Sequence, residues 1–115
     1  MENTDASVVL TTVGSADQGE ALVRALLDRR LVACGTVLPG ARSYYRWEGA
    51  VADELEVVIL LKTRRDAVPA LERAFGELHP YAVPELLSLP AAAGSAAYLD
   101  WIARETVPAE PAGRG

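Results

Sequence analysis

The sequence of 115 residues predicts an α+β fold, a ferredoxin-like split βαβ sandwich in which helices cover one face of an antiparallel sheet. Three observations lead to this prediction. Strand-like runs and helical patterns follow one another as β-α-β, β-α-β, with one more helix at the end. The two central strand-like runs meet at Glu48-Gly49, as in a β-hairpin. The length suits one domain with its own core, which we place at residues 7–107.

The first part of the chain predicts a strand and a helix. A polar leader at residues 1–6 is expected to be flexible. Residues 7–13 are β-branched and apolar enough for a central strand. Ser15 and Gln18 form a capping-box pattern, in which the hydroxyl and the side-chain amide satisfy helical N–H groups. A helix is therefore expected to begin there and to end near Arg30.

The hairpin is unusually long for a chain of this size. Its first strand begins at Val32, is interrupted at Pro39-Gly40 as by a bulge, and resumes at Arg42. Extended to Trp47, this strand would span roughly 50 Å, whereas a compact domain of this size is roughly 35 Å across. The hairpin must therefore overhang its own core and expose unpaired edges and apolar side chains, so we predict an oligomer. The exposed apolar side chains would be Tyr44, Tyr45, Trp47, Val51 and Leu55.

The second half predicts a strand, a helix and a further strand. Residues 55–61 are nearly all apolar, which is typical of a strand buried on both faces. Asp66 can cap a helix, and Pro80 ends it because the residue before a proline avoids helical dihedrals. Residues 83–89 predict a short strand, and its prolines indicate an edge position.

The chain closes with a predicted helix and a tail. Ser95 can cap this helix, with Tyr98, Leu99 and Ile102 facing inward. From Pro108 onward the sequence is rich in proline and glycine, and we expect residues 108–115 to be loose.

Composition narrows the class of protein. The chain has 16 acidic and 11 basic residues and a net charge of −5, and no cluster of Lys or Arg suggests nucleic-acid binding. No run approaches the roughly 18 apolar residues of a membrane span, and no secretory leader is recognisable. The single cysteine fits a reducing compartment. We therefore expect a cytoplasmic protein without membrane or nucleic-acid partners.

Cys34 and His79 are the candidate soft metal ligands. His79 is the only histidine, and it either caps the end of a helix or projects into a cleft. Cys34 is either a small buried hydrophobic residue or a metal ligand. Thiolate and imidazole together suit copper or zinc, but a closed site needs four ligands. Glu48, Glu85 or another chain would have to complete such a site.

A second candidate is a polar and aromatic set that can converge at the end of the hairpin. One interpretation is a protein interface, since Tyr, Trp and Arg are enriched there, and the other is a pocket between subunits for a small ligand or ion. Lys62 and Glu85 are also a candidate for an ordinary salt bridge. No nucleophile–base pair is visible, so an enzyme that uses His79 as acid or base, with Glu85 or Lys62 nearby, is the least favoured hypothesis and the protein is expected not to be an enzyme. The set comprises Tyr45, Arg46, Trp47, Glu48, Lys62, Tyr81 and Glu85.

Several segments together resemble the divalent-cation tolerance family, CutA. The resemblance spans nearly the whole chain. It implies a ferredoxin-like protomer in a tight homotrimer formed by strand pairing between chains, related in architecture to PII signalling proteins. It also implies a link to tolerance of copper and other divalent cations. The segments are LVACGTVLPG (31–40), SYYRWEG (43–49), LLKT (60–63), HPYAVPELLSLP (79–90) and YLDWIARET (98–106).

The resemblance also implies site residues. Cys34 and His79, with Glu85, become candidate copper contacts, and the positions of a ligand cleft are Tyr45, Trp47, Glu48, Lys62, Tyr81 and Glu85. The chain departs from the family pattern at four positions, of which Ala82 removes a carboxylate beside His79. The others are Gly35, Thr36 and Ala50.

The expected function is therefore a non-enzymatic trimer that binds a divalent cation or a small ligand in clefts between chains. Two alternatives stay open, a PII-like regulator of a partner protein and a stable scaffold without a metal role. Regulators of the PII type act through a long loop between the middle strands, whereas WEGAVADE predicts a tight turn.

Overall fold

The computed structural model describes residues 4–107 and has an α+β fold with a four-stranded antiparallel sheet and three α-helices. The strand order is β2-β3-β1-β4. The predicted order of strands and helices is confirmed. Residues 1–3 of the predicted leader and the predicted loose tail lie outside the described residues, and Ala6 already belongs to a strand. The elements are β1 (Ala6–Val13), α1 (Ala16–Asp28), β2 (Cys34–Trp47), β3 (Ala50–Arg64), a 3-10 turn (Arg65–Ala67), α2 (Val68–Leu78), β4 (Leu87–Pro90) and α3 (Ala96–Glu105).

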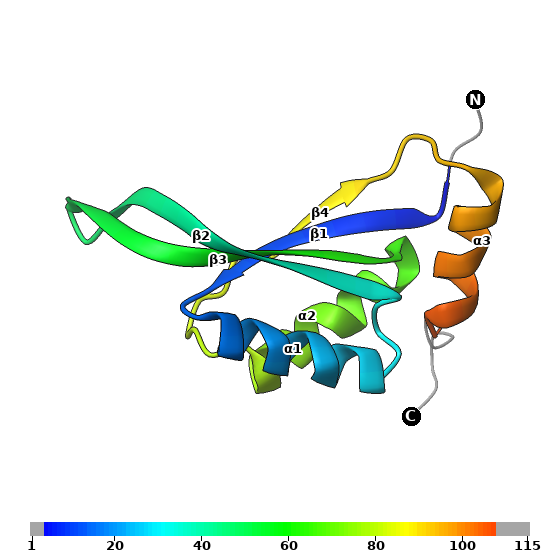
Figure 1. Cartoon of the computed structure of the whole chain (residues 1–115), viewed down its shortest axis with the longest axis horizontal. Coiled ribbons are helices and arrows are strands. Elements are labelled where there is room, and N and C mark those ends of the chain that lie inside the picture. Colours follow the sequence, from blue (N-terminus) through cyan, green and yellow to red (C-terminus); the bar gives the residue numbers. More distant parts are fainter. Residues whose placement is uncertain (1–3, 108–115) are drawn as a thin grey trace.

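The helices α1 and α2 lie on one face of the sheet, and α3 lies at the end of the sheet opposite the hairpin tip (Figure 1). The core fills the space between the sheet and the two helices. Strands β1 and β3 place every second side chain in this core, and the helices supply Leu26, Leu71 and Phe75. This alternation decides on which face of the sheet each strand residue of the candidate site lies, because neighbours along a strand point to opposite faces. The buried strand residues include Val9, Val13, Val57, Ile59 and Leu61.

No described helix covers the other face of the sheet (Figure 1). The strand register places on it the alternate residues of all four strands. The prediction that residues 55–61 are buried on both faces is therefore wrong for one chain. Val58 and Leu60 are only half-buried on this face, and Leu55 on the overhang is 66% exposed. We call this surface the open face, and its apolar side chains are Val8, Leu10, Leu38, Val58, Leu60, Leu87 and Leu89.

The long hairpin is confirmed. Strands β2 and β3 have 14 and 15 residues, and they extend past the helices to the left in Figure 1. The radius of gyration is 15.0 Å, above the value of about 13 Å for a compact domain of this length. The first strand of the hairpin begins at Cys34 rather than at the predicted Val32, the longest axis of the molecule is 42 Å, and a register shift between Leu38 and Ala41 confirms the predicted bulge. At the tip, Glu48 and Gly49 have φ values of 49° and 83°, the left-handed conformation of a two-residue hairpin turn.

The N-terminal cap of α1 is the predicted one, whereas that of α2 is not. Ser15 caps α1, since its Oγ accepts a hydrogen bond of 3.1 Å from the N–H of Gln18. The prediction that Asp66 caps α2 is wrong. Asp66 lies in the 3-10 turn and its carboxylate accepts from Arg64, while Ala67 occupies the cap position of α2.

Two further details differ near the end of the chain. Strand β4 is an edge strand as predicted but has only four residues, because residues 83–86 lead from α2 to the far side of β1 before pairing begins at Leu87. Tyr98 does not face inward. It is 43% exposed, and its ring centroid lies 5.6 Å from that of Trp101, while Leu99 and Ile102 pack inward.

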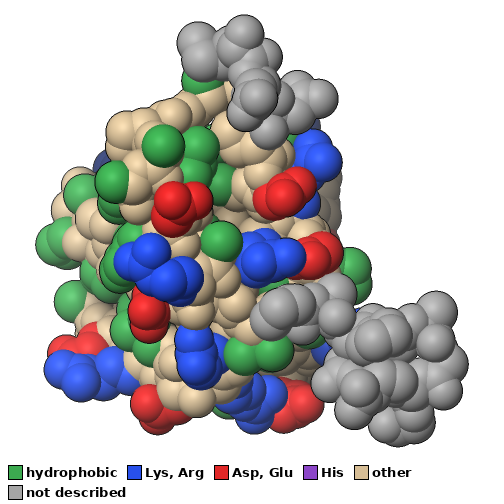
Figure 2. Space-filling model, turned by 90° about the vertical axis from the view of Figure 1, so that its right-hand side faces the viewer, with side chains coloured by type: hydrophobic (Ala, Val, Ile, Leu, Met, Phe, Trp, Pro, Cys, Tyr) green, Lys and Arg blue, Asp and Glu red, His purple; other side chains and the backbone are tan. Residues whose placement is uncertain are grey.

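Charges of both signs are interleaved on the surface at the α3 end (Figure 2). No Lys or Arg patch is visible among the described residues of this face, in agreement with the composition. None of the helices within residues 4–107 is long and apolar enough to span a membrane.

Candidate functional site

A hollow of about 670 Å³ lies between the overhanging hairpin and the segment that follows α2. We call it the hairpin hollow. Strand β1 contributes Thr12 near its end, and β2 and β3 contribute side chains from beyond the bulge. Residues 80–85 form the opposite wall. The lining residues are Thr12, Ser43, Tyr44, Tyr45, Trp47, Glu54, Glu56, Pro80, Tyr81, Ala82, Val83 and Glu85.

Tyr81 and Glu56 join the two walls. The Tyr81 hydroxyl donates a hydrogen bond of 2.7 Å to Oε2 of Glu56. Glu56 is only 8% exposed, so this bond satisfies a carboxylate that would be costly to bury alone. The hydroxyl partner therefore makes a charged residue tolerable in the apolar run of β3.

His79 holds the turn that places Tyr81. Pro80 follows His79, which is the C-cap residue of α2, so the chain leaves the helix there. Nδ1 of His79 then accepts a hydrogen bond of 3.1 Å from the N–H of Tyr81, and the two ring centroids are 5.1 Å apart. The positions of Tyr81 and of the segment after it are thus set by a side chain that lies under β1.

The His79 ring is buried and its nitrogens are both engaged. Nε2 lies 3.1 Å from Oγ1 of Thr11, and because Nδ1 is an acceptor, Nε2 carries the proton and donates. Burial lowers the pKa of His79, which favours this neutral form. Its ring contacts Thr11 and Tyr81 rather than the last carbonyls of α2, whereas its backbone N–H caps the carbonyl of Phe75 at 2.9 Å.

The hairpin hollow is acidic. Its charged lining residues are Glu54, Glu56 and Glu85, and its lining contains no Lys, Arg or His. Burial, and next the charge of Glu56, raise the pKa of Glu85. Burial and the nearby carboxylate of Glu54 raise the pKa of Tyr45, and burial and Glu56 raise that of Tyr81. All three shifts show that additional negative charge is disfavoured here, first because of desolvation and then because of the neighbouring carboxylates.

Cys34 and His79 lie on opposite faces of the sheet. Cys34 pairs with Lys62, which pairs with Val8, and all three point to the open face. Thr11, the partner of His79, points to the helix-covered face. The two predicted soft ligands therefore do not meet within one chain.

The donor set does not fit a resident copper ion in a single chain. The thiol is separated from the imidazole, and both imidazole nitrogens are occupied by hydrogen bonds. In the part of the chain that the structure describes, no three His, Cys, Asp or Glu side chains are grouped to hold a metal. Glu85 lines the hairpin hollow, where neither Cys34 nor His79 is a lining residue.

The predicted cleft set is brought together only in part. Tyr45, Trp47, Tyr81 and Glu85 line the hairpin hollow. Glu48 lies in the hairpin turn, and Lys62 pairs with Cys34 nearer the other end of β3, where it forms none of the ion pairs found among residues 4–107. The salt bridge considered between Lys62 and Glu85 is therefore absent from these residues.

Sequence reasoning missed Glu54 and Glu56. They belong to the same strand as the apolar run 55–61, and only the pairing of Ser43 with Glu54 and of Ala41 with Glu56 shows which face they share with Tyr45. A signal was present, because a glutamate inside an apolar strand requires a partner.

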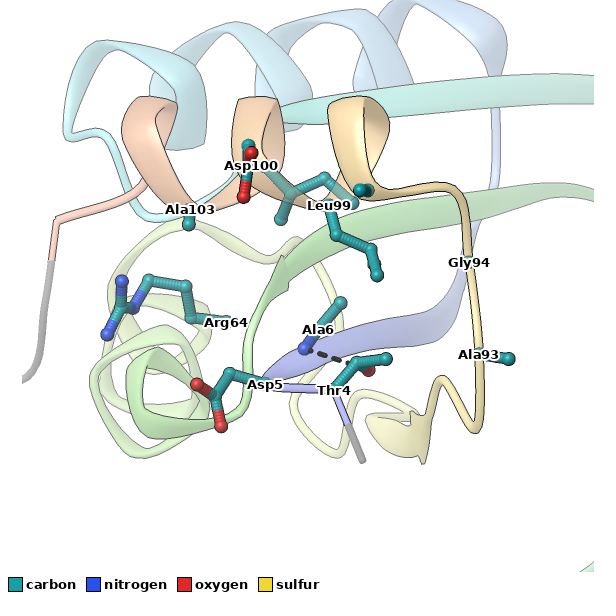
Figure 3. Close-up of a pocket in the computed structure, with 11 residues that line it drawn as sticks. Thr4, Asp5, Ala6, Arg64, Ala93, Gly94, Leu99, Asp100 and Ala103 are labelled. Atoms are coloured by element: carbon teal, nitrogen blue, oxygen red, sulfur yellow. Dashed lines mark hydrogen bonds between the residues drawn. The ribbon is translucent and has the colours of Figure 1, made fainter. Parts of the chain in front are cut away.

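A second, smaller hollow of about 340 Å³ lies between α3 and the start of β1 (Figure 3). Arg64 and Asp5 lie on one side and the loop of Ala93 and Gly94 on the other. Its one basic group, Arg64, is held by two hydrogen bonds to Asp66 at 2.9 and 3.0 Å. This basic group is thus engaged by a carboxylate of its own segment, and the hairpin hollow is the better candidate site.

Comparison with known proteins gives a consistent result. The family model of the CutA1 divalent ion tolerance protein matches residues 7–105. A relative from Thermus thermophilus, "Divalent-cation tolerance protein CutA", is 43% identical over 86% of this chain and 96% of its own length. "Protein CutA, chloroplastic" from Arabidopsis thaliana is 35% identical over 86% of this chain and 54% of its own length.

Solved structures agree with the sequence relatives. The divalent cation tolerance protein Cut A1 from Thermus thermophilus matches with a TM-score of 0.86 at 42% identity, covering 89% of this chain and 99% of that one. CutA from Xylella fastidiosa matches with a TM-score of 0.87 at 36% identity, covering 90% of this chain and all of that one.

Proposed function

The chain belongs to the CutA1 divalent ion tolerance family, and from this membership we propose that it supports divalent-cation tolerance as a cytoplasmic homotrimer that binds its ligand without catalysis. The ligand site is the hairpin hollow, placed at the boundary between subunits. The ferredoxin-like arrangement and the relation to PII proteins belong to the same proposal, supported by the strand order β2-β3-β1-β4 and by one helix-covered face.

The apolar open face is the observation that carries this proposal. Leu38, Leu87 and Leu89 are 44%, 56% and 51% exposed on it, beside half-buried Val8, Leu10, Val58 and Leu60. An apolar surface of this kind marks a protein–protein contact. The outer edges of β2 and β4 also offer backbone groups for pairing with another chain, as edge strands do. Both features support assembly through strands, with the open faces covered by sister copies.

The geometry restricts how cation tolerance can work. Within one chain it offers no Cys34–His79 copper site, so the proposal assigns neither residue a joint role in holding a metal. The hairpin hollow, with its three carboxylates, is the surface whose charge suits a positive ligand.

Three observations support binding over catalysis or PII-like signalling. His79, the candidate general base, is buried between hydrogen-bond partners and does not line the hairpin hollow. The hydroxyl beside it, that of Thr11, accepts a hydrogen bond from Nε2–H of His79, so the ring is not placed to activate this hydroxyl as a nucleophile. The connection between β2 and β3 is a turn of two residues, too short for the loop through which PII-type proteins act on partners.

A complementation experiment tests the function. Cells lacking this protein would be grown in raised copper or zinc with wild type, Leu89→Glu or Leu27→Glu. Leu89 lies on the open face and is 51% exposed, whereas the control, Leu27, is a leucine on α1 that is 39% exposed. We expect wild type and Leu27→Glu to restore growth and Leu89→Glu to fail while its circular dichroism shows a folded protein. Full restoration by a monomeric Leu89→Glu protein would contradict the proposal.

A further inference from the structure

We propose that the hairpin hollow binds a small organic cation, an alkylammonium or quaternary ammonium group, between aromatic rings and carboxylates. The inference rests on the proposed function only in taking this hollow as the ligand site of the assembled protein.

The charge of the hairpin hollow favours a cationic ligand. Glu54, Glu56 and Glu85 are the ionisable acids of the lining, and no basic side chain of the lining offsets them. Glu56 accepts a hydrogen bond from Tyr81 and Glu54 interacts with the Tyr45 hydroxyl, which leaves Glu85 as the lining carboxylate that faces a ligand. An anion would be repelled, and a neutral molecule would gain no charge–charge attraction from these carboxylates.

Aromatic rings are concentrated in the hairpin hollow. Four of the chain's seven aromatic residues line this hollow, although the core uses only Phe75. Trp47 lies on the overhang, outside the core of its own chain, and in the proposed trimer it would lie at the boundary between subunits. Ring faces of Trp and Tyr attract cations, and sets of such rings recognise quaternary ammonium groups. The four residues are Tyr44, Tyr45, Trp47 and Tyr81.

A bare divalent ion fits the hairpin hollow less well than an organic cation does. Calcium and magnesium require about six or more oxygen ligands at roughly 2.0–2.6 Å. Within residues 4–107 no three acidic, histidine or cysteine side chains are grouped for such coordination. The hollow measures about 670 Å³, a volume within the range of small-molecule sites, which are roughly 300–1,000 Å³. A diffuse organic cation needs no coordination shell and can fill it.

Isothermal titration of the full, assembled protein with tetramethylammonium chloride tests the proposal. tert-Butanol serves as a neutral probe of similar shape, manganese chloride as a bare divalent cation, and sodium chloride as the ionic-strength control. The variants are Trp47→Leu and Glu85→Gln. Their matched controls are Trp101→Leu, on α3, and Glu20→Gln, on the exposed side of α1.

We expect wild type to bind tetramethylammonium and not tert-butanol. Trp47→Leu and Glu85→Gln should each weaken binding about three- to tenfold, with no change in the two controls. Three results would each overturn the inference. They are equal binding of tert-butanol, equal affinities of all variants for tetramethylammonium, and the absence of a binding heat when tetramethylammonium is titrated into wild type. Manganese binding without tetramethylammonium binding would overturn it too, yet would leave the proposed cation site standing. Sedimentation of the same samples reports the trimer independently.

Discussion

The hydroxyl of Tyr81 lies 2.7 Å from Oε2 of Glu56 and donates a hydrogen bond to it, joining the segment after α2 to the base of the overhanging hairpin. These residues are 25 positions apart in the sequence. The bond closes one side of the hairpin hollow, so the same contact shapes the site and stabilises the fold.

Removing this donor should be costly. Tyr81→Phe keeps the ring but leaves a buried carboxylate without its hydroxyl partner, and we expect a loss of about 1–3 kcal/mol in the free energy of unfolding. Urea denaturation measures it. Tyr44→Phe is the matched control, because Tyr44 is largely exposed, and should change stability by less than about 0.5 kcal/mol. Equal stability of the two variants would show that the bond contributes nothing.

Stability should fall in mild acid because of His79. Its folded-state pKa is lowered by burial, so at a pH near and below its ordinary value of about 6.5 the unfolded chain binds a proton that the folded ring resists. The free energy of unfolding therefore decreases as pH falls from 7 through this range. The stabilising contribution of the neutral His79 is fully present above this range. Denaturation at pH 7 and 5.5 should show a smaller decrease for His79→Gln than for wild type.

Glu85 supplies a control of opposite sign for this experiment. Its folded-state pKa is raised, so its contribution is present at low pH and is lost as pH rises from its unfolded value through the folded one. Glu85→Gln should therefore make the acid-induced decrease steeper. Identical pH dependence of wild type and His79→Gln would contradict the assigned state of the histidine.

Gly35 is required by the packing of α1 on β2. A Cβ at this position would lie 2.8 Å from both methyl groups of Val23 and 3.0 Å from Leu61. Gly35→Ala should therefore cost about 1–3 kcal/mol. Adding Val23→Ala removes the clash, so the double variant should lose less than the sum of the single losses. Strict additivity in denaturant would contradict this contact.

Copper titration should separate Cys34 from His79. Because the two residues lie on opposite faces of the sheet, they cannot complete one site in a chain. In calorimetry, any binding lost in Cys34→Ser should persist in His79→Gln with unchanged stoichiometry. Loss of the same binding event in both variants, each shown to be folded, would restore a joint site.

Local patterns were sufficient for much of the fold. The helix start at Ser15, the bulge at Pro39-Gly40 and the turn at Glu48-Gly49 depend on short-range backbone chemistry, and each was predicted. The length of the hairpin also followed from the sequence. The start of β4 and the outward direction of Tyr98 did not, because both depend on how distant segments pack.

The sequence predicted only part of the site, namely Tyr45, Trp47, Tyr81 and Glu85. Trp47 and Tyr81 are conspicuous in the sequence, whereas Glu56 becomes a site residue through the register of β2 with β3 and through its bond to Tyr81. His79 was expected at a helix end or in a cleft. Its ring instead supports the wall of the hollow from beneath β1, a role that depends on its distant contact with Thr11.

Sedimentation equilibrium of the full chain across dilution tests the central claim most directly. The apolar open face and the overhanging hairpin require cover by sister copies, so we expect wild type and Leu27→Glu to sediment at three times the chain mass of 12.2 kDa. Leu89→Glu, which places a charge on the open face, should shift the equilibrium to the monomer. A wild-type protein that sediments as a folded monomer of 12.2 kDa throughout would contradict the account.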